Sequence, residues 1–445
     1  MEDYRTVADA VAAEIAGGRL RPGDRLPPQR AFARERGLAP STAARVYREL
    51  TRRGLVVGEV GRGTFVRASE PLPAPALTEP AGSRVDLELN YPVAPGQSAL
   101  LAGGLERLLR PDVLDAALRP TGVRGTVAAR EAAAAFLTRD GWAPSPGDVV
   151  FAGNGRQAIS GAVAALVPSG ERLGVEALTY PVIKGIAARL GVTAVPISTD
   201  EHGLRPEALE DAHRRAPLRA VYVQPTLQNP FSVTMPARRR AELAGTLERL
   251  NLFAVEDAIW AFLRDDGPPP LAAFAPDRTI LADSLSKRLA PGLAIGMAVV
   301  PPSLADRVAS ALRSGSWAPT GYALEAAAGW MRDGTAETIG RAKRADVGAR
   351  QRIVAERLPG AALRTDPRSY FCWWDLPAPW RAETFVAAAA RRGIAVTPAA
   401  AFVVGPGAAP NAVRIGLASP PPETLAHALG TLARIAAGTP DEVES

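Results

Sequence analysis

The sequence predicts an α/β protein whose larger part is a mainly parallel sheet covered by helices, preceded by a small basic module. Three observations lead to this expectation. Short apolar runs alternate with long helical segments between residues 149 and 300, as they do in parallel sheets. Positive charge is concentrated at one end of the chain, and a proline-rich stretch separates that end from the rest.

The charge asymmetry places a basic module at the N-terminus. Residues 1–67 contain 13 arginines and 8 acidic residues, and 13 − 8 = +5 of the total net charge of +6. The remaining 378 residues therefore carry +1. Basic charge confined to one module is typical of nucleic-acid binding.

Three helices are expected in the basic module. Val7, Val11 and Ile15 mark one face of the first helix, which ends at Gly17-Gly18. The second helix runs from Pro28 to Arg36 and stops at Gly37, and the third begins near Ser41. The third helix has an apolar face and a basic face, formed by Ala43, Val46, Tyr47 and Leu50 and by Ser41, Arg45, Arg48 and Arg52.

A two-stranded hairpin is expected after these helices. Leu55-Val56-Val57 and Thr64-Phe65-Val66 flank Gly61-Arg62-Gly63, which places an arginine at the tip. Three helices and a hairpin form a winged helix-turn-helix. The segment resembles the winged-helix domain of the GntR regulator family, through residues 18–27, Arg30, Ser41-Thr42 and residues 61–66.

The resemblance implies that the module binds a double-stranded DNA operator. Arginine side chains can bind a guanine edge or a phosphate, and the amino end of a recognition helix favours phosphate contacts. The residues expected to contact DNA are Arg30, Ser41, Thr42, Arg45 and Arg62.

The predicted organisation is a DNA-binding domain over residues 1–67, a linker over 68–84 and a larger domain over 85–440. The linker contains Pro71, Pro73, Pro75 and Pro80, which disfavour a helix or a central strand. One cysteine, Cys372, and three scattered histidines give neither a disulfide framework nor a metal site. No secretion signal and no membrane span are evident, so we expect a cytoplasmic protein.

In the larger domain, polar motifs follow the predicted strands. The run Val149 to Phe151 leads into a glycine-rich turn, residues 153–158, whose amides suit a phosphate. Further apolar runs are Ala220 to Val223, Leu252 to Val255, Ile280 to Ala282 and Ile295 to Val300. Asp257 follows one of these strands, at the sheet edge where such folds bind ligands.

Lys287 is one of three lysines, with Lys184 and Lys343, in a chain whose other basic residues are arginine. A Schiff base requires an amine, and arginine cannot replace it. The order and spacing of Asp257 and of Ser284, Ser286 and Lys287 resemble fold-type I aminotransferases over residues 85–435. With the winged helix, the whole chain resembles a MocR-type regulator.

This resemblance implies a fold-type I domain, with helices on both faces of the sheet and a smaller C-terminal α+β part. It also implies that pyridoxal 5′-phosphate is held on Lys287, the catalytic residue, as an internal aldimine. The implied cofactor-binding residues are Asn154, Gly155, Arg156, Tyr180, Asn229, Asp257, Trp260, Ser284, Ser286 and Lys287. Tyr180 would stack on the cofactor ring, Asn229 would bind its phenolate oxygen and Asp257 its pyridinium nitrogen. Arg414 would bind a substrate carboxylate.

Two positions depart from the family pattern. Position 294 is alanine where the family commonly has a phosphate-binding arginine. Arg156 and Arg288 are the two candidates to supply that charge instead. Three residues after Asp257 the chain has Trp260 instead of the usual tyrosine, and an indole donates a hydrogen bond but accepts none.

The leading hypothesis is a homodimeric transcriptional regulator that senses a small amino acid or amine through aldimine formation on Lys287. Two alternatives remain open. Asp257 and Lys287 also permit a catalytically active aminotransferase that carries a DNA-binding domain. The same family resemblance permits a sensor of pyridoxal phosphate itself.

Overall fold

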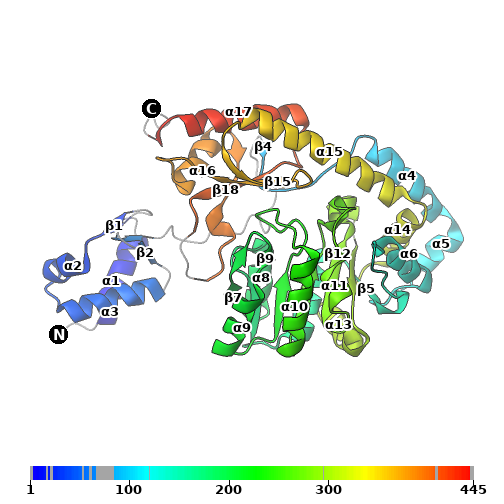
Figure 1. The fold of residues 1–445 in the computed structure, drawn as a ribbon, viewed down its shortest axis with the longest axis horizontal. Coiled ribbons are helices and arrows are strands. Elements are labelled where there is room, and N and C mark those ends of the chain that lie inside the picture. Colours follow the sequence, from blue (N-terminus) through cyan, green and yellow to red (C-terminus); the bar gives the residue numbers. More distant parts are fainter. Residues whose placement is uncertain are drawn as a thin grey trace. The chain divides into compact units, whose positions relative to one another are not determined.

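The computed structural model describes residues 4–16, 19–20, 24–52, 55–59, 63–66, 85–119, 121–293, 295–405 and 409–440. The structure divides into two compact units, Met1–Ala74 and Pro75–Ser445 (Figure 1). The expected linker, residues 68–84, lies outside the described residues.

The N-terminal unit has the three predicted helices and the predicted hairpin. Its elements are α1 (Tyr4–Ala16), β1 (Arg25–Leu26), α2 (Gln29–Glu35), α3 (Pro40–Arg52), β2 (Val56–Glu59) and β3 (Gly63–Val66). The apolar face of α3 packs against that of α1, and Val11, Val46 and Leu50 are fully buried. Gly37, with φ of +64°, follows α2 in the left-handed conformation that glycine tolerates. The strand β1 was not expected from the sequence, and it pairs antiparallel with β3.

The larger unit is built on a sheet of seven strands among the described residues, in the order β5-β13-β12-β11-β10-β6-β7. These strands are β5 (Val149–Ala152), β6 (Arg172–Glu176), β7 (Thr193–Ile197), β10 (Ala220–Val223), β11 (Phe253–Asp257), β12 (Thr279–Ser284) and β13 (Gly296–Val299). The pairs from β12 to β7 are parallel, and β13 runs antiparallel to both of its neighbours. The sheet is therefore mainly parallel, as expected.

Helices cover both faces of this sheet. They are α4 (Gln97–Glu106), α5 (Pro111–Ala117), α6 (Val127–Leu137), α7 (Gly155–Leu166), α8 (Pro181–Arg189), α9 (Pro206–Arg215), α10 (Ala237–Arg249), α11 (Leu271–Phe274), α12 (Leu285–Arg288), α13 (Ala305–Ser314) and α14 (Gly321–Arg332). A short pair of strands, β8 (Thr199–Asp200) and β9 (Gly203–Leu204), lies between β7 and α9.

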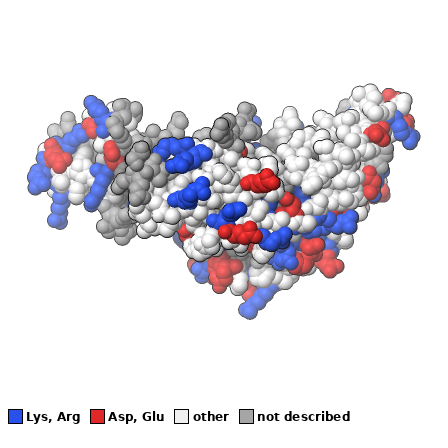
Figure 2. All heavy atoms as spheres, turned by 90° about the horizontal axis from the view of Figure 1, so that it is seen from above, with Lys and Arg blue, Asp and Glu red and all other residues white. Residues whose placement is uncertain are grey.

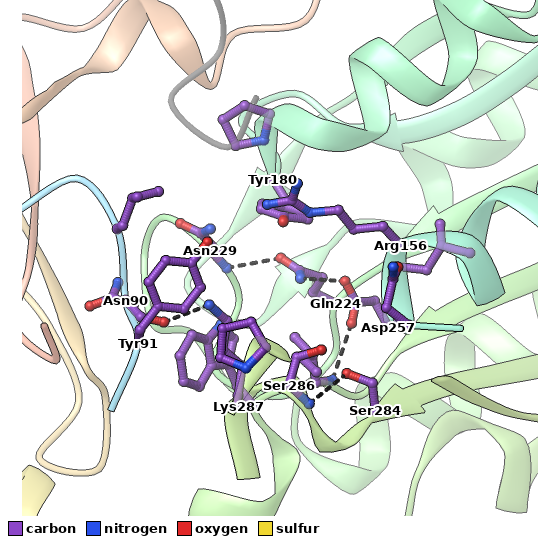
Figure 3. Close-up of a pocket in the computed structure, with 18 of the residues that line it drawn as sticks. Asn90, Tyr91, Arg156, Tyr180, Gln224, Asn229, Asp257, Ser284, Ser286 and Lys287 are labelled. Carbon is purple, nitrogen blue, oxygen red and sulfur yellow. Dashed lines mark hydrogen bonds between the residues drawn. The ribbon is translucent and has the colours of Figure 1, made fainter. Parts of the chain in front are cut away.

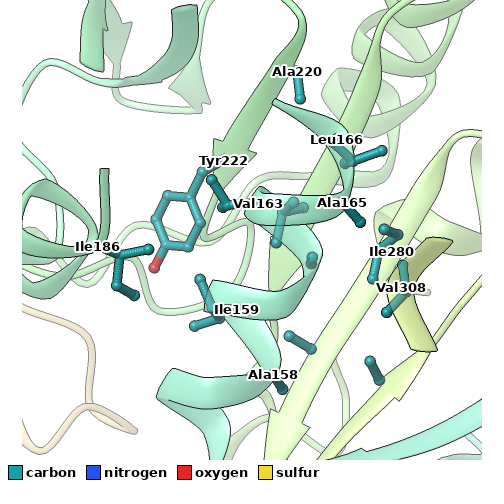
Figure 4. Close-up of a cluster of buried hydrophobic side chains, with 14 of the residues drawn as sticks. Ala158, Ile159, Val163, Ala165, Leu166, Ile186, Ala220, Tyr222, Ile280 and Val308 are labelled. Carbon is teal, nitrogen blue, oxygen red and sulfur yellow. The ribbon is translucent and has the colours of Figure 1, made fainter. Parts of the chain in front are cut away.

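The central strands are buried on both faces, which explains why their sequences are mostly apolar, whereas the edge strand β7 is partly exposed. In β10, Ala220 and Tyr222 pack into a cluster with α7, α8 and α13, whereas Val221 and Val223 pack into a second cluster with α9 and α10. Figure 4 shows the first cluster, where Ile159 and Val163 of α7 lie against the sheet.

A smaller lobe follows at the C-terminal end. Its elements are α15 (Thr335–Arg357), β14 (Ala362–Arg364), β15 (Phe371–Asp375), α16 (Ala382–Arg391), β16 (Ile394–Ala395), β17 (Thr397–Pro398), β18 (Ala412–Gly416) and α17 (Pro422–Ala437). The strands β14-β15-β18-β17 form an antiparallel sheet. The first described strand of the larger unit, β4 (Val85–Asp86), pairs with β16 and so joins this lobe.

None of the helices in the described part of the chain combines the length and the apolar character that a bilayer span requires.

Candidate functional site

A cavity of about 240 Å³ lies at the carboxyl ends of β10, β11 and β12. All the residues that the sequence assigned to a cofactor or to its ligand line this cavity, although they are spread over 261 positions from 154 to 414 (Figure 3). They are Asn154, Gly155, Arg156, Tyr180, Asn229, Asp257, Trp260, Ser284, Ser286, Lys287 and Arg414.

Lys287 points into the cavity from the short helix α12. Its Nζ donates a hydrogen bond to the carbonyl oxygen of Asn90 at 2.5 Å. The same nitrogen lies 4.3 Å from the ring centroid of Tyr91 and 5.4 Å from that of Trp260. Burial lowers the pKa of the Lys287 amine to about 7, and neighbouring cations act in the same direction. A substantial fraction of this amine is therefore neutral, and nucleophilic, near neutral pH.

Asp257 is a carboxylate that is 2% exposed, and no ion pair joins it to a cation of the described residues. Its Oδ2 accepts hydrogen bonds from the Tyr222 hydroxyl at 2.6 Å and the Gln224 amide at 2.8 Å, and its Oδ1 accepts one from the Ile259 amide at 3.1 Å. Burial raises the pKa of Asp257, while these donors oppose the rise. Such a carboxylate suits a cation that a ligand brings into the cavity.

The first turn of α7 meets the end of β12 at the cavity wall. Asn154 caps α7, since its Oδ1 accepts a hydrogen bond from the Gln157 amide at 3.0 Å. A Cβ on Gly155 would lie 3.0 Å from Ser284 Oγ, so glycine permits the close approach of the two segments. The first amides of a helix lack partners within it, and together with two serine hydroxyls they suit an anion.

Of the two arginines that could replace the phosphate-binding charge missing at position 294, only Arg156 lines the cavity. Arg288 is 6% exposed, and its Nη2 donates to Asp283 Oδ2 at 2.7 Å. Because its guanidinium lies between the rings of Phe136 and Phe262, Arg288 does not line the cavity. Arg156 does, and its guanidinium lies beside Tyr180. Ala294 itself lies outside the described residues.

Arg414 reaches the cavity from β18 in the smaller lobe and is 6% exposed. Its Nη2 donates to the carbonyl oxygen of Glu88 and to Thr397 Oγ1, and its Nη1 donates to Asn229 Oδ1 at 3.4 Å. Its Nε has no hydrogen-bond partner among the described residues. Burial lowers the pKa of Arg414 to about 10, so the guanidinium stays charged at neutral pH.

Several residues that line the cavity, or that contact its side chains, were not predicted from the sequence. Asn90 and Tyr91 lie in the segment that follows β4, where no motif marks them. Gln224 joins Asp257 to Asn229, because its Oε1 accepts a hydrogen bond from the Asn229 amide at 3.2 Å. Tyr222 and Gln224 stand at the end of β10 next to β11, so their position at the same sheet edge as Asp257 was an available signal.

The residues assigned to DNA contact lie mostly on the surface of the N-terminal unit. Arg30, Ser41 and Arg45 are exposed, and Thr42 is part-buried. The guanidinium of Arg45 lies 5.0 Å from the ring centroid of Tyr4. Figure 2 shows basic side chains on this unit at the left of the view, and all of them are arginines because the unit has no lysine. Arg62, expected at the hairpin tip, lies outside the described residues.

Two family models match the chain. The model of the bacterial regulatory proteins of the gntR family matches residues 3–66, and that of the aminotransferases of class I and II matches residues 117–432.

Curated relatives match nearly the whole length. The uncharacterized HTH-type transcriptional regulator YdeF of Bacillus subtilis (strain 168) is 29% identical over 419 residues, covering 94% of this chain and 90% of that protein. The HTH-type pyridoxine biosynthesis transcriptional regulator PdxR of Corynebacterium glutamicum is 27% identical over 428 residues, covering 94% and 92%.

Solved structures match the larger unit. An archaeal alanine:glyoxylate aminotransferase superposes with a TM-score of 0.72 at 23% sequence identity, covering 79% of this chain and 90% of that one. At this identity the likeness concerns the fold.

Proposed function

We propose the following function for this chain, which belongs to the class I and II aminotransferase family. With its GntR-family domain it also belongs to the MocR-type transcriptional regulators. The larger unit binds pyridoxal 5′-phosphate through Lys287 and responds to a small amino acid or amine. The N-terminal unit binds a double-stranded DNA operator. When bound, the cofactor supplies an aldehyde that condenses with primary amines and a ring that withdraws electrons from the adjacent carbon.

One observation carries the cofactor proposal: Lys287 and Asp257 line the same cavity. Lys287 presents an amine whose pKa is lowered to about 7 by burial, so it reacts as a nucleophile near neutral pH. Asp257 presents a buried carboxylate whose hydrogen-bond donors are neutral groups. A protonated ring nitrogen would supply the cation that Asp257 lacks.

The phosphate of the cofactor fits the first turn of α7. Asn154 and Gly155 open this helix beside Ser284, and Gly155 leaves no side chain in the space between them. Ser286 lines the same wall, and Arg156 brings a positive charge into the cavity. Helix amides, hydroxyl groups and one guanidinium together provide the donors that a phosphate requires.

The ligand proposal rests on Arg414 and on the space around it. Arg414 is charged, reaches the cavity from the smaller lobe and retains an Nε–H without an acceptor. A carboxylate is the anion that a guanidinium binds best in such a setting. Because Arg414 and Lys287 come from different lobes, a ligand that binds both would favour the arrangement of the lobes that brings these two side chains together. Regulation requires that the ligand bind one such arrangement better than another.

Two other functions have specific support. The retained pair of Lys287 and Asp257, with Arg414, favours a working aminotransferase that carries a DNA-binding domain. The relative named as a pyridoxine biosynthesis regulator favours a sensor of pyridoxal phosphate itself. Multiple turnovers with an amino-acid donor and a keto-acid acceptor would establish the first. DNA binding that responds to pyridoxal phosphate alone, without an amine, would establish the second.

The test is a titration of the purified full-length protein with pyridoxal 5′-phosphate, followed by visible absorption. We expect a saturable band in the wild type and in a Lys184→Ala control, and none in Lys287→Ala. Added amino acids or amines should then shift the band, and the effective ones should change operator affinity. A wild type that develops no saturable band would disprove cofactor binding at Lys287.

A further inference from the structure

Lys343 is a buried lysine that lies outside the cavity. It is 0% exposed, and α15 holds it beneath the turn that carries Lys287. Its Nζ donates hydrogen bonds to the carbonyl oxygen of Lys287 at 3.0 Å and to that of Leu289 at 2.7 Å. A buried lysine is costly, so two well-placed acceptors on one short turn indicate a specific role.

The turn that Lys343 binds makes few hydrogen bonds within itself. The helix α12 is four residues long, and its last carbonyls have no partners within it. Lys343 supplies donors to two of these carbonyls, and Gln97 Nε2 supplies a second donor to Leu289 O at 3.1 Å. The direction in which the Lys287 side chain leaves this turn therefore depends on α15.

The other contacts of α15 lead into the smaller lobe. The Tyr370 hydroxyl lies 2.9 Å from both the Lys343 carbonyl oxygen and Asp346 Oδ2. Arg350 Nε donates to Asp346 Oδ2 at 2.7 Å, and Arg350 Nη1 donates to the carbonyls of Leu417 and Pro420 at 2.6 and 2.7 Å. Figure 1 shows α15 reaching from α17 in this lobe to α4 and α14.

The same lobe also holds the amine of Lys287. The Ala418 amide donates to Asn90 Oδ1 at 3.1 Å, and the Asn90 carbonyl oxygen accepts the hydrogen bond from Lys287 Nζ. Residues 417–420 are thus connected to Lys287 by two routes. One route runs from Arg350 through Asp346 and the Tyr370 hydroxyl to Lys343, and from there to the main chain of Lys287. The other runs through Asn90 to the side chain of Lys287.

We propose that Lys343 is a positioning residue that fixes the Lys287 turn to α15 and thereby couples the state of the Lys287 amine to residues 417–420 of the smaller lobe. A ligand that engages the amine removes its hydrogen bond to Asn90 and breaks one of the two routes. Lys343 maintains the other route, so the change at the Lys287 amine is transmitted to residues 417–420. The coupling rests on the function proposed above, whereas the positioning role applies to the protein without cofactor.

The first test measures the reactivity of Lys287 without cofactor. Reductive methylation with formaldehyde and cyanoborohydride, read by peptide mass spectrometry from pH 6 to 10, reports separately on each of the three lysines. The charged groups that act on Lys287 come from α7, β18, α15 and β11, and are Arg156, Arg414, Lys343 and Asp257. Removing the charge that Lys343 carries below its own pKa of about 7 should raise the pKa of Lys287 and slow its methylation at pH 6.5 several-fold.

The variant for this test is Lys343→Met in the full chain, and the matched control is Lys184→Met. Lys184 also donates to two carbonyls, those of Ala401 and Val403, but does not contact the Lys287 turn. Only Lys343→Met should shift the midpoint of the Lys287 profile upward; equal profiles in both variants and the wild type would overturn the positioning role. If Lys343→Met does not fold, Lys343→Gln replaces it with the same expected shift, because its side chain is neutral and one bond too short to reach both carbonyls.

The second test measures the coupling through Tyr370→Phe, which keeps Lys343 and removes the hydroxyl between Lys343 and Asp346. Pyridoxal 5′-phosphate should change the deuterium uptake of residues 412–420 in the wild type. In Tyr370→Phe this response should fall several-fold while the methylation profile of Lys287 stays as in the wild type. An undiminished response would overturn the coupling. A wild type without the absorption band would instead contradict the proposed function, and the methylation result would stand independently.

Discussion

At the scale of single residues, several buried groups in the larger unit have pKa values far from those that they have in water. Lys287 and Lys343 have pKa values lowered to about 7, in both cases chiefly by burial. Glu176 is 0% exposed at the end of β6, and its Oε1 has no partner. Only the folded chain creates these environments, so the sequence identified Lys287 by its neighbours and gave no indication of the other two.

Glu176 gives a prediction for stability against pH. Burial raises the pKa of Glu176 from 4.5 to about 8, against the opposing effect of the Gln228 hydrogen bond. Between these values the folded state binds a proton that the unfolded chain does not, so this group's contribution to stability is full at low pH and is lost as pH rises towards 8. Glu176→Gln, which stays neutral, should unfold with nearly wild-type stability at pH 4.5 and be more stable by a few kcal/mol at pH 8.

Chemical denaturation at the two pH values measures this difference. Glu207→Gln, at an exposed position, serves as the control for loss of a carboxylate. A stability gain in Glu176→Gln that is the same at both pH values would show that Glu176 is already ionised in the folded protein.

At the scale of secondary-structure elements, the sequence predicted β5, β10, β11, β12 and β13, because each contains a short and largely buried apolar run. It did not predict β6, or the partly exposed edge strand β7. Asp257 and Ser284 end neighbouring parallel strands, so their convergence at one sheet edge followed from topology. The contacts that depend on α15 could not be predicted from this topology. Its apolar residues are sparse, and nothing in its sequence marks Lys343 as facing the Lys287 turn.

The segment around Asn90 and Tyr91 was equally hidden. It reaches the cavity because β4 pairs with β16, more than 300 residues later in the chain. Such long-range pairing of two-residue strands leaves no periodic pattern to read. The structure also favours Arg156 over Arg288 as the source of positive charge at the cavity, because Arg288 already pairs with Asp283. Only the folded chain shows this pairing.

The first turn of α7 gives a prediction at this scale. Gly155→Ala would place a Cβ 3.0 Å from Ser284 Oγ, and one of the two segments must move. If this wall binds the phosphate, the variant should bind pyridoxal 5′-phosphate roughly tenfold more weakly, about 1.4 kcal/mol, with an unchanged fold. Titration of the visible band measures the affinity. Gly103→Ala is the matched control, because a Cβ there meets nothing within 4 Å; equal affinities in the two variants would place the phosphate elsewhere.

At the scale of the whole molecule, exposed apolar side chains gather on one segment of the larger unit. Leu109 is 78% exposed and Leu118 is 76% exposed, and Val93, Leu100, Leu114 and Val127 belong to the same stretch. Several large apolar side chains exposed within one stretch of the chain are typical of an interaction surface. We therefore propose that this segment is the interface of a homodimer, which would present two DNA-binding units to two half-sites.

Leu109→Glu combined with Leu118→Glu should convert the dimer to a monomer, because the charges would have to be buried in the interface. Light scattering after gel filtration measures the mass. The control is Ala355→Glu with Ala362→Glu, two exposed positions outside the segment. Dimers of unchanged stability in the leucine variant would exclude this surface as the interface.

The DNA-binding unit gives a prediction for salt dependence. Arg30→Ala with Arg45→Ala removes two exposed arginines of the predicted contact face. If both contact phosphates, operator affinity should fall, and the slope of log affinity against log salt should become shallower by about 0.9 for each lost contact. Fluorescence anisotropy over a range of salt concentrations measures both quantities. Arg357→Ala, an exposed arginine of α15, should change neither, and an unaltered slope in the double variant would mean that other residues contact the DNA.

The central claim is that Lys287 is the residue that binds pyridoxal 5′-phosphate, and borohydride reduction tests it most directly. The chain has three lysines, so reduction of the cofactor-treated protein followed by peptide mapping identifies the modified residue without ambiguity. We predict a stable phosphopyridoxyl group on Lys287, formed at stoichiometric cofactor, and none on Lys184 or Lys343. Modification spread over all three lysines, or its absence from Lys287, would contradict the account.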